Sequence, residues 1–423
     1  MKIVILSEGF PPETFGGAEV IASNLASALL KKCLEVSVIT TTKDKNKVGV
    51  SIENGLKIYS IYSDYNTRYK AYRSLKNAGV VNEVSRIVRE IKPDIVHAHN
   101  IHNHISYASL KEVKKYCIAV CMTMHDVMSV HYGKLGAKVD TEGNVVMDSI
   151  NPWKQFLQYK LRYNPLRNVF IRHYLKSVDK IFAVSLALKE VLEKQGILGI
   201  EVLHNGIDVS LWKVNHRALV DFKQKYNPEN KKVLFFSGRL SSAKGGFVAV
   251  SVLKQVSLKM KEVLLIVAGD KNKWTEDMEK IAGGSGISDK IIFTGRLSHD
   301  DIRYAYSASD VVLTLSLYVD PFPTVNLEAM ACKKPVVGTI FGGTREVVVS
   351  GKTGYLVNPR DIELTSRKTL ELLEDRQKAE SFGLAGFNRV SSDFSQEKWA
   401  EETLSYYATM LLNRGVNKHI NKK

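Results

Sequence analysis

Cysteine is scarce in this chain of 423 residues, and its pattern excludes two kinds of structure. The four cysteines are Cys33, Cys117, Cys121 and Cys332, and no two of them form a C-x-x-C pair. Neither a disulfide framework nor a zinc site is therefore expected, which leaves buried, reduced thiols as the interpretation. Long apolar runs are missing too, because no stretch approaches the roughly 20 residues that a bilayer crossing requires.

No secretory signal is visible either, since Lys2 leads directly into an apolar strand and a polar turn. We therefore expect a cytoplasmic protein. The chain is too long for a single hydrophobic core, so two domains are expected, with three as the alternative. Charged residues make up 25% of the chain and hydrophobic ones 44%, which is the composition of a globular rather than a disordered protein.

Acidic residues are absent from Ser149 to Val178, although the chain as a whole carries a net charge of +16. Such an excess of positive charge favours a negative partner or surface. We expect no nucleic-acid partner, because no helix-turn-helix, zinc or RNP signature accompanies the charge. Two interpretations stay open for this segment: contact with an anionic membrane surface, and an ordinary solvated pair of helices. Aromatic residues are interleaved with its six basic residues, which are Lys154, Lys160, Arg162, Arg167, Arg172 and Lys176.

Apolar strands alternate with helices along the chain, which predicts an α/β protein with parallel sheets. Gly16 and Gly17 open the first helix, a geometry typical of phosphate contact, although G-x-G-x-x-G is absent and a dinucleotide site is not indicated. The expected helices include 18–32, 72–91 and 394–412, and the expected strands are 3–6, 36–40, 57–62, 95–98, 118–123, 233–237, 264–268, 291–294, 311–315 and 335–337.

Histidines gather after the strand at 95–98, where His97, His99, His102 and His104 fall within eight residues. We predict no metal site there, on the expectation that His97 and His99 alternate along the strand and point to opposite faces. His125 follows the next strand at its carboxyl end, where open α/β sheets bind ligands. The alternative for His125 is a loop histidine that water satisfies.

The stretch 316–338 combines a strand end, a turn and a helix in a way that suits an anion. Pro323 should occupy the first helical position, with the helix body at 324–332, so that the amides of Val325 and Asn326 remain free donors. Asp320 and Glu328 flank this helix start. Phosphate and sugar hydroxyls are therefore the expected ligands, and an ordinary connection with two solvated acids is the alternative.

A second anion-binding loop follows the strand at 233–237. It presents Arg239 and Lys244 just before Gly245 and Gly246, and two cations on one short loop suit an anionic ligand. A solvated basic loop is the alternative. Further glycines end the strands that follow, at Gly295 before Arg296 and at the pair 342–343.

Four segments then match, in order, the large retaining glycosyltransferase family 4 of the GT-B fold. They are PPETFGGAE, HNGID, GRLSSAKGG, and DPFPTVNLEAMACKKPVVG followed by FGGTREVV and GKTGYLV. The chain resembles this family over nearly its whole length. The resemblance implies two Rossmann-like domains with parallel sheets facing a central cleft: 1–212 for the acceptor, 213–393 for the nucleotide sugar, and 394–423 as a helix crossing back to the first domain with a basic tail.

The resemblance also implies an activity, namely retaining hexosyl transfer from a UDP-sugar or GDP-sugar to a glycan or lipid-linked acceptor of surface glycan synthesis. No cofactor and no metal is implied, because cations replace the metal that a D-x-D motif holds and this chain has no D-x-D. The implied location is the cytoplasm, peripherally at the inner face of the plasma membrane. The alternative is a catalytically weak or inactive protein that only binds a sugar nucleotide.

The roles of single residues follow from the same resemblance. Arg239 and Lys244 are similar to the pair that binds the donor diphosphate, while Asp320 and His125 match contacts to the donor sugar. Glu328 matches the acid that holds the ribose. The remaining donor contacts implied are Thr324, Val325, Asn326, Gly16, Gly17, Gly295 and Arg296.

Two departures from the family pattern occur in one segment. Asp320 stands where the family has glutamate, and Pro323 stands where it has glycine. Because F-P-T-V changes both features together, we interpret it as a subgroup with its own backbone at this turn, with altered sugar preference or weakened catalysis as alternatives.

Overall fold

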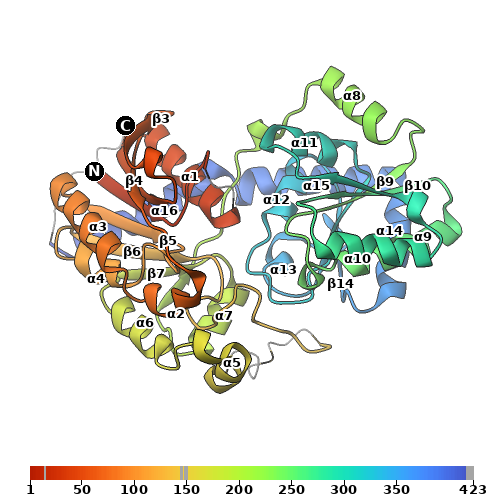
Figure 1. Ribbon diagram of the computed structural model, residues 1–423. Helices are drawn as coiled ribbons and strands as arrows, with labels where there is room; N and C mark the ends of the chain where they lie inside the picture. Colours follow the sequence, from red (N-terminus) through yellow and green to blue (C-terminus); the bar gives the residue numbers. More distant parts are fainter. Residues whose placement is uncertain (14–15, 143–145, 147–150, 416–423) are drawn as a thin grey trace. The chain divides into compact units, whose positions relative to one another are not determined.

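The computed structural model describes residues 1–13, 16–142, 146 and 151–415, and Figure 1 shows their helices and strands. The chain forms two compact units, each assembled from more than one segment. Unit 1 consists of Met1–Ala137, Met147–Gly206 and Gln396–Lys423, and unit 2 consists of Lys138–Val146 and Ile207–Ser395. None of the helices in the described ranges is both long and apolar enough for a membrane crossing.

Unit 1 is built on an eight-stranded sheet with the order β3-β4-β2-β1-β5-β6-β7-β8. All neighbouring strands are parallel, as predicted, except β3 and β4, which form an antiparallel hairpin at one edge. The hairpin turns at Asn54 and Gly55, both with positive φ (50° and 81°), as a tight two-residue turn requires. The strands are β1 Lys2–Ser7, β2 Glu35–Thr42, β3 Gly49–Glu53, β4 Leu56–Tyr62, β5 Ile95–His99, β6 Ala119–Met124, β7 Lys180–Ala183 and β8 Ile200–Val202.

Helices cover the sheet of unit 1 through apolar faces. The core combines Ile3 and Ile5 of β1 with Leu25 of α1 and with Trp399 and Tyr407 of α16, all nearly or fully buried. The single helix predicted at 72–91 is interrupted and becomes α2 and α3. The helices are α1 Gly17–Lys31, α2 Lys70–Arg73, α3 Ala78–Ile91, α4 Ala108–Val113, α5 Pro152–Tyr159, α6 Arg167–Leu175, α7 Leu186–Lys194 and α16 Gln396–Leu412.

Unit 2 has a six-stranded, wholly parallel sheet with the order β11-β10-β9-β12-β13-β14. Its strands are apolar on both faces because helices cover both. The strands are β9 Lys232–Ser237, β10 Val263–Ala268, β11 Ile291–Gly295, β12 Val311–Thr314, β13 Val336–Thr339 and β14 Gly354–Val357. The helices are α8 His216–Tyr226, α9 Gly246–Lys259, α10 Lys273–Gly284, α11 His299–Ala308, α12 Thr324–Ala331, α13 Thr344–Val347, α14 Ile362–Glu374 and α15 Arg376–Asp393.

Each sheet has one point where the chain changes direction across it. In unit 1 this point lies between β1 and β5, and in unit 2 it lies between β9 and β12. The loops that leave the carboxyl ends of two such strands diverge to opposite sides, and the crevice between them is where open α/β sheets bind ligands. Candidate residues that lie close to these two points are therefore placed to contact a ligand.

Candidate functional site

In unit 2, the loops after β9 and β12 are joined by an ion pair. The Lys244 ammonium donates to Asp320 Oδ2 at 2.6 Å, and the Ser316 hydroxyl donates to the same oxygen at 2.9 Å. The Lys244 ammonium also lies 5.5 Å from the centre of the Tyr318 ring. Two residues predicted separately from different segments therefore meet at the switch point of the sheet.

The charge of Lys244 is secure although the side chain is largely buried. Burial alone would lower its pKa, but Asp320 and Tyr318 outweigh this and raise the pKa above the ordinary lysine value. Arg239 lies on the same loop, is exposed, and makes no hydrogen bond or ion pair to any described residue. One cation of the predicted pair is thus held by a carboxylate, and the other is available to a ligand.

Glycines let the neighbouring turns approach the Asp320 turn closely. Gly342 has φ of 67°, and a Cβ there would lie 2.2 Å from the Asp320 carbonyl oxygen. The Gly343 amide donates to that same oxygen at 2.9 Å. On the other side, a Cβ on Gly245 would lie 2.0 Å from the Leu315 carbonyl oxygen. The glycine pairs noted in the sequence therefore shape the backbone around the ion pair.

The helix after this turn differs from the prediction in two details. Pro323 is the N-cap rather than the first helical residue, and α12 ends at Ala331. The Asn326 amide is not free as predicted, because it donates to the Pro323 carbonyl oxygen at 3.1 Å. This short-range bond tightens the first turn, as commonly happens at helix ends. Thr324 and Val325 occupy the two positions whose amides have no partner within a helix.

Glu328 is held by a tyrosine that the sequence pattern did not single out. The Tyr306 hydroxyl donates to Glu328 Oε2 at 2.6 Å and lies 3.1 Å from the Ser237 hydroxyl. Tyr306 is fully buried, so burial together with the Glu328 charge raises its pKa well above the ordinary value, and it remains a donor. Nothing in the spacing of α11 distinguishes this tyrosine from a packing residue.

The structure does not bring Gly295 and Arg296 to the switch point. Gly295 is the last residue of β11 and Arg296 follows it, and β11 is separated from β9 by β10. Arg296 is exposed and lies 3.9 Å from Asp270. The Gly295 carbonyl accepts a hydrogen bond from the Gly269 amide at 3.0 Å, which links two neighbouring strand ends. Their assignment as donor contacts stays a prediction.

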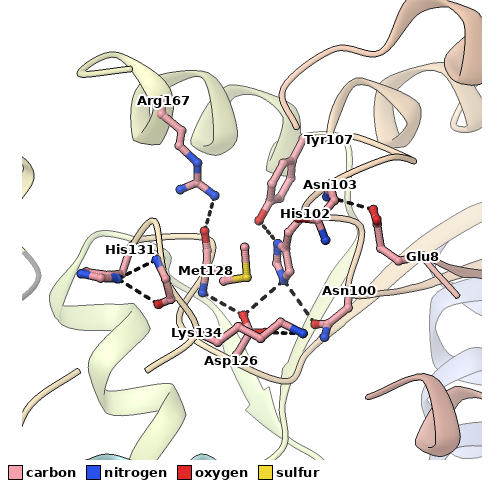
Figure 2. Close-up of polar contacts among 11 residues, drawn as sticks. Glu8, Asn100, His102, Asn103, Tyr107, Asp126, Met128, His131, Lys134 and Arg167 are labelled. Carbon is pink, nitrogen blue, oxygen red and sulfur yellow. Dashed lines mark hydrogen bonds and ion pairs between the residues drawn. The ribbon is translucent and has the colours of Figure 1, made fainter. Parts of the chain in front are cut away.

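In unit 1, Glu8 bridges the switch point between β1 and β5. Its carboxylate accepts hydrogen bonds from the backbone amides of residues 103, 104 and 105 at 3.0, 2.8 and 3.1 Å. Figure 2 shows this carboxylate pointing at the loop after β5. The predicted glycines lie on the following loop, where Gly16 is the N-cap of α1 and Gly17 is its first residue.

Three of the histidines, His97, His99 and His125, lie together as neutral rings, and His97 and His99 are fully buried. His97 and His99 do not point to opposite faces as predicted, because residues two apart on a strand share a face, and their ring centres are 4.2 Å apart. His125 Nε2 lies 2.9 Å from His99 Nδ1. Burial lowers the pKa of His97 and of His125 to about 3, and that of His99 well below its ordinary value. His125 therefore faces any ligand as an uncharged hydrogen-bonding group.

A polar network fixes the loop that follows His125 (Figure 2). His102 Nε2 lies 3.3 Å from Asp126 Oδ1, and His102 Nδ1 lies 2.6 Å from the Tyr107 hydroxyl. Burial would raise the pKa of Asp126, but His102, Lys134 and the Met128 amide outweigh it and keep the pKa below its ordinary range. Among the described residues, no group of three histidine, cysteine or carboxylate side chains could hold a metal ion.

Sequence models of two glycosyltransferase families match consecutive parts of the chain. "Glycosyltransferase Family 4" matches residues 15–211 and "Glycosyl transferases group 1" matches residues 220–389, so together they span both units. The chain belongs to the group 1, family 4 glycosyltransferases. Its fold is accordingly GT-B, with two α/β domains built on parallel sheets.

This glycosyltransferase is similar in sequence to several known enzymes and similar in fold to solved structures. The alpha-maltose-1-phosphate synthase of Mycolicibacterium smegmatis is 25% identical over 96% of this chain and 99% of its own length. A GDP-mannose-dependent phosphatidylinositol monomannoside mannosyltransferase of Mycobacterium tuberculosis is 26% identical over 49% of this chain and 54% of its own. The crystal structure of Anabaena HepE in complex with UDP-glucose superposes with a TM-score of 0.70, at 20% identity, over 96% of this chain and 100% of that one.

Proposed function

We propose that this protein is a retaining, metal-independent hexosyltransferase that uses a nucleotide-diphospho-sugar donor. The observation that carries the proposal is the Lys244–Asp320 pair beside the exposed Arg239 at the switch point of unit 2. Two cations there can neutralise the diphosphate as it leaves, the task that a metal performs in transferases with D-x-D. The complex of HepE with UDP-glucose supports a UDP-sugar, and the GDP-mannose-dependent relative supports a GDP-sugar.

In this proposal each residue has one task on the donor. Glu328, held by Tyr306, accepts hydrogen bonds from the ribose hydroxyls. The Thr324 and Val325 amides at the start of α12 donate to phosphate, as helix N-termini do. In unit 1, His125 contacts a hydroxyl of the donor sugar as a neutral imidazole. The diphosphate itself takes the acceptor proton, so that no enzyme nucleophile is required.

The proposed acceptor is a lipid-linked or polysaccharide intermediate of surface glycan synthesis, met in the cytoplasm at the inner face of the plasma membrane. The relative that glycosylates phosphatidylinositol monomannoside supports a lipid-linked acceptor. The alternative is a sugar-nucleotide binder with little or no transferase activity, and the shorter carboxylate at Asp320 is the observation that favours it.

A donor panel tests the proposal in two steps. Thermal unfolding is first measured with UDP, GDP, ADP and their sugars, because a ligand at about 100 times its Kd adds about 2.7 kcal/mol of stability. Release of nucleoside diphosphate from the stabilising donor is then followed, and the anomeric configuration of the product is read by proton NMR. Stabilisation without any release would favour the inactive binder, whereas inverted product would refute the retaining mechanism.

A further inference from the structure

The helices α5 and α6 of unit 1 bury polar side chains that surface helices usually expose. Their buried residues include Gln155 on α5 and both Arg167 and Asn168 on α6, each no more than 6% exposed. Arginine in particular is almost never fully buried unless its charge is paired or bonded. On α6 the buried residues also include Ile171 and Leu175, so its inward side carries both polar and apolar groups, whereas Gln155 is the buried residue of α5.

The inward polar residues have a definite task, because they hold the loop that follows His125 and Asp126. Gln155 Nε2 and Asn168 Nδ2 both donate to the Val130 carbonyl oxygen, at 3.2 and 2.9 Å. The Arg167 guanidinium donates to the Met128 carbonyl oxygen, as Figure 2 shows. Since one carbonyl serves both helices, α5 and α6 lie against the same loop.

The outward sides carry large apolar side chains. On α5, Trp153 is 73% exposed and Leu157 is 71% exposed, and they lie one helical turn apart. Leu166, Val169 and Phe170, at or next to the start of α6, are 59%, 54% and 44% exposed and share a face at spacings of three and four. We refer to these five residues as the α5–α6 face. Exposed apolar groups that gather on neighbouring turns are typical of interaction surfaces, and each of the two helices presents such a group.

The charge around the α5–α6 face favours a negatively charged partner. Lys154, Lys160, Arg162, Arg172 and Lys176 are exposed, and no acidic residue occurs from 149 to 178, of which the first two residues lie outside the described part. Within the described ranges, four of these five, all except Lys154, form no salt bridge. A second copy of the chain would bring two sets of like charge together, whereas an anionic surface would neutralise them.

We propose that the α5–α6 face docks on an anionic lipid bilayer, with Trp153, Leu157 and Phe170 at the headgroup level and the basic residues on lipid phosphates. Tryptophan and basic side chains are the residues that favour this depth. The inference deepens the proposed function, on which it rests for the lipid-linked acceptor. Because the inner side of the same helices holds the loop after His125, docking places that loop next to the membrane surface.

Vesicle flotation of the full-length protein tests the proposal. Vesicles of phosphatidylcholine alone are compared with vesicles that also contain phosphatidylglycerol, at low and at high salt. The test variant is Leu157→Ser/Leu166→Ser, and its matched control is Leu258→Ser/Leu384→Ser, whose leucines are 73% and 51% exposed on α9 and α15. Donor turnover is measured in parallel in vesicle-free buffer, with melting temperature as the check on folding.

We expect flotation only with the anionic vesicles and less flotation at high salt, because salt screens the charges. The test variant should lose at least about tenfold of the bound protein, because two leucines leave the lipid contact, and the control should not. Equal recovery on neutral vesicles, or no flotation at all, would overturn the proposal. A dimer that light scattering detects in the wild type, and that the test variant abolishes, would identify a second copy as the occupant instead. If the wild-type protein floats with the anionic vesicles but does not turn over any donor, the result would count against the proposed function alone.

Discussion

The pairing of Lys244 with Asp320 changes what each cation of the donor loop is expected to do. Lys244 is already bonded to Asp320, which is only 4% exposed, whereas Arg239 on the same loop is exposed. A diphosphate bound there gains attraction from both cations but repulsion from Asp320. The electrostatic potential at the diphosphate therefore depends on three residues. Removing each of them should change turnover and stability in a different way.

Arg239→Ala and Lys244→Ala should both slow sugar transfer, but only the second should destabilise the fold. Losing one group aimed at developing charge costs on the order of 100 to 1,000-fold in rate. Lys244→Ala also leaves the Asp320 carboxylate buried without its partner, which lowers the melting temperature. Turnover and thermal unfolding of both variants are compared with Lys254→Ala, an exposed lysine of α9. Near-normal turnover in both variants would remove the diphosphate assignment.

Asp320 offers a sharper test because the family residue can be restored. Its Oδ2 already accepts from Lys244 at 2.6 Å and from Ser316 at 2.9 Å, so Asp320→Glu would crowd a filled space and we expect activity to fall. A rise in activity would instead mark Asp320 as a decayed catalytic residue. Asp320→Asn should lower kcat, and full activity in Asp320→Ala would exclude this residue from the site.

Tyr306 is expected to act through Glu328 rather than on the substrate. Glu328→Gln should raise the donor KM by about 10-fold, consistent with about 1.5 to 3 kcal/mol for a hydrogen bond to a charged group. Tyr306→Phe removes the hydrogen bond to Glu328 and the contact with the Ser237 hydroxyl but keeps the Glu328 carboxylate, so a smaller rise in KM with unchanged kcat is expected. Steady-state kinetics with the donor and its 2′-deoxy analogue measure this, and Tyr304→Phe on the same helix is the control. Unchanged preference between the two donors in Tyr306→Phe would contradict the role.

Among the elements, those buried on both sides were the predictable ones. Strands β9 to β13 of unit 2 and the central strands β1, β5 and β6 of unit 1 are short apolar runs that lie close to the predicted ranges, whereas β14 lies in none of them. Strand β3 lies outside the predicted ranges because most of its residues are exposed, although Asn54-Gly55 marks its turn. The burial of Gln155, Arg167 and Asn168 was unpredictable from periodicity, because a hydrophobic pattern shows which residues are apolar and not which polar residues are buried.

The candidate site was predictable as a set of loops but not as a set of contacts. Glycine pairs and cations at strand ends identified the loops after β9, β12 and β13 because backbone approach there requires glycine. The Lys244–Asp320 bond joins residues 76 positions apart, and the partly buried Tyr306–Glu328 bond joins residues 22 positions apart. Neither has a local spacing rule, so only the folded sheet reveals them.

The turn after β13 should matter to donor binding although it carries no charge. Gly342→Ala adds a methyl group that would lie 2.2 Å from the Asp320 carbonyl oxygen, so the Asp320 turn must move. Gly351→Ala is a matched control, because Gly351 has a similar φ of 79° but open space around its Cβ position. Both variants should lose some stability from the positive φ. Only Gly342→Ala should also weaken donor binding, which isothermal titration with the stabilising nucleoside diphosphate measures; equal affinities would show that the turn is not held in this way.

The stability of the whole chain should depend on pH through the histidine cluster of unit 1. His97 is enclosed on several sides: its ring nitrogens lie 2.7 Å from the Tyr407 hydroxyl of α16 and 2.7 Å from the Thr123 hydroxyl of β6, and its ring packs against His99 and Phe182. No charged group is bonded to it. Burial lowers the pKa of His97, and of His125, from 6.5 to about 3, so both rings stay neutral in the folded protein at pH values where the unfolded chain binds protons.

The sign of the effect follows from this difference in bound protons. Below pH 6.5 the unfolded chain gains protons that the folded protein does not accept, so the free energy of unfolding decreases as the pH falls from about 6.5 towards about 3. Each neutral histidine contributes a slope of at most about 1.4 kcal/mol per pH unit. Urea unfolding of the full chain at pH 7, 6, 5 and 4 measures the slope.

His97→Gln should lower the free energy of unfolding at pH 7, because a buried hydrogen-bonded ring is replaced. The same variant should reduce the pH slope by the contribution of about one bound proton. His173→Gln, at an exposed position on α6, should change neither. A slope that is unaffected by His97→Gln would mean that His97 is already protonated, or already hydrated, in the folded protein.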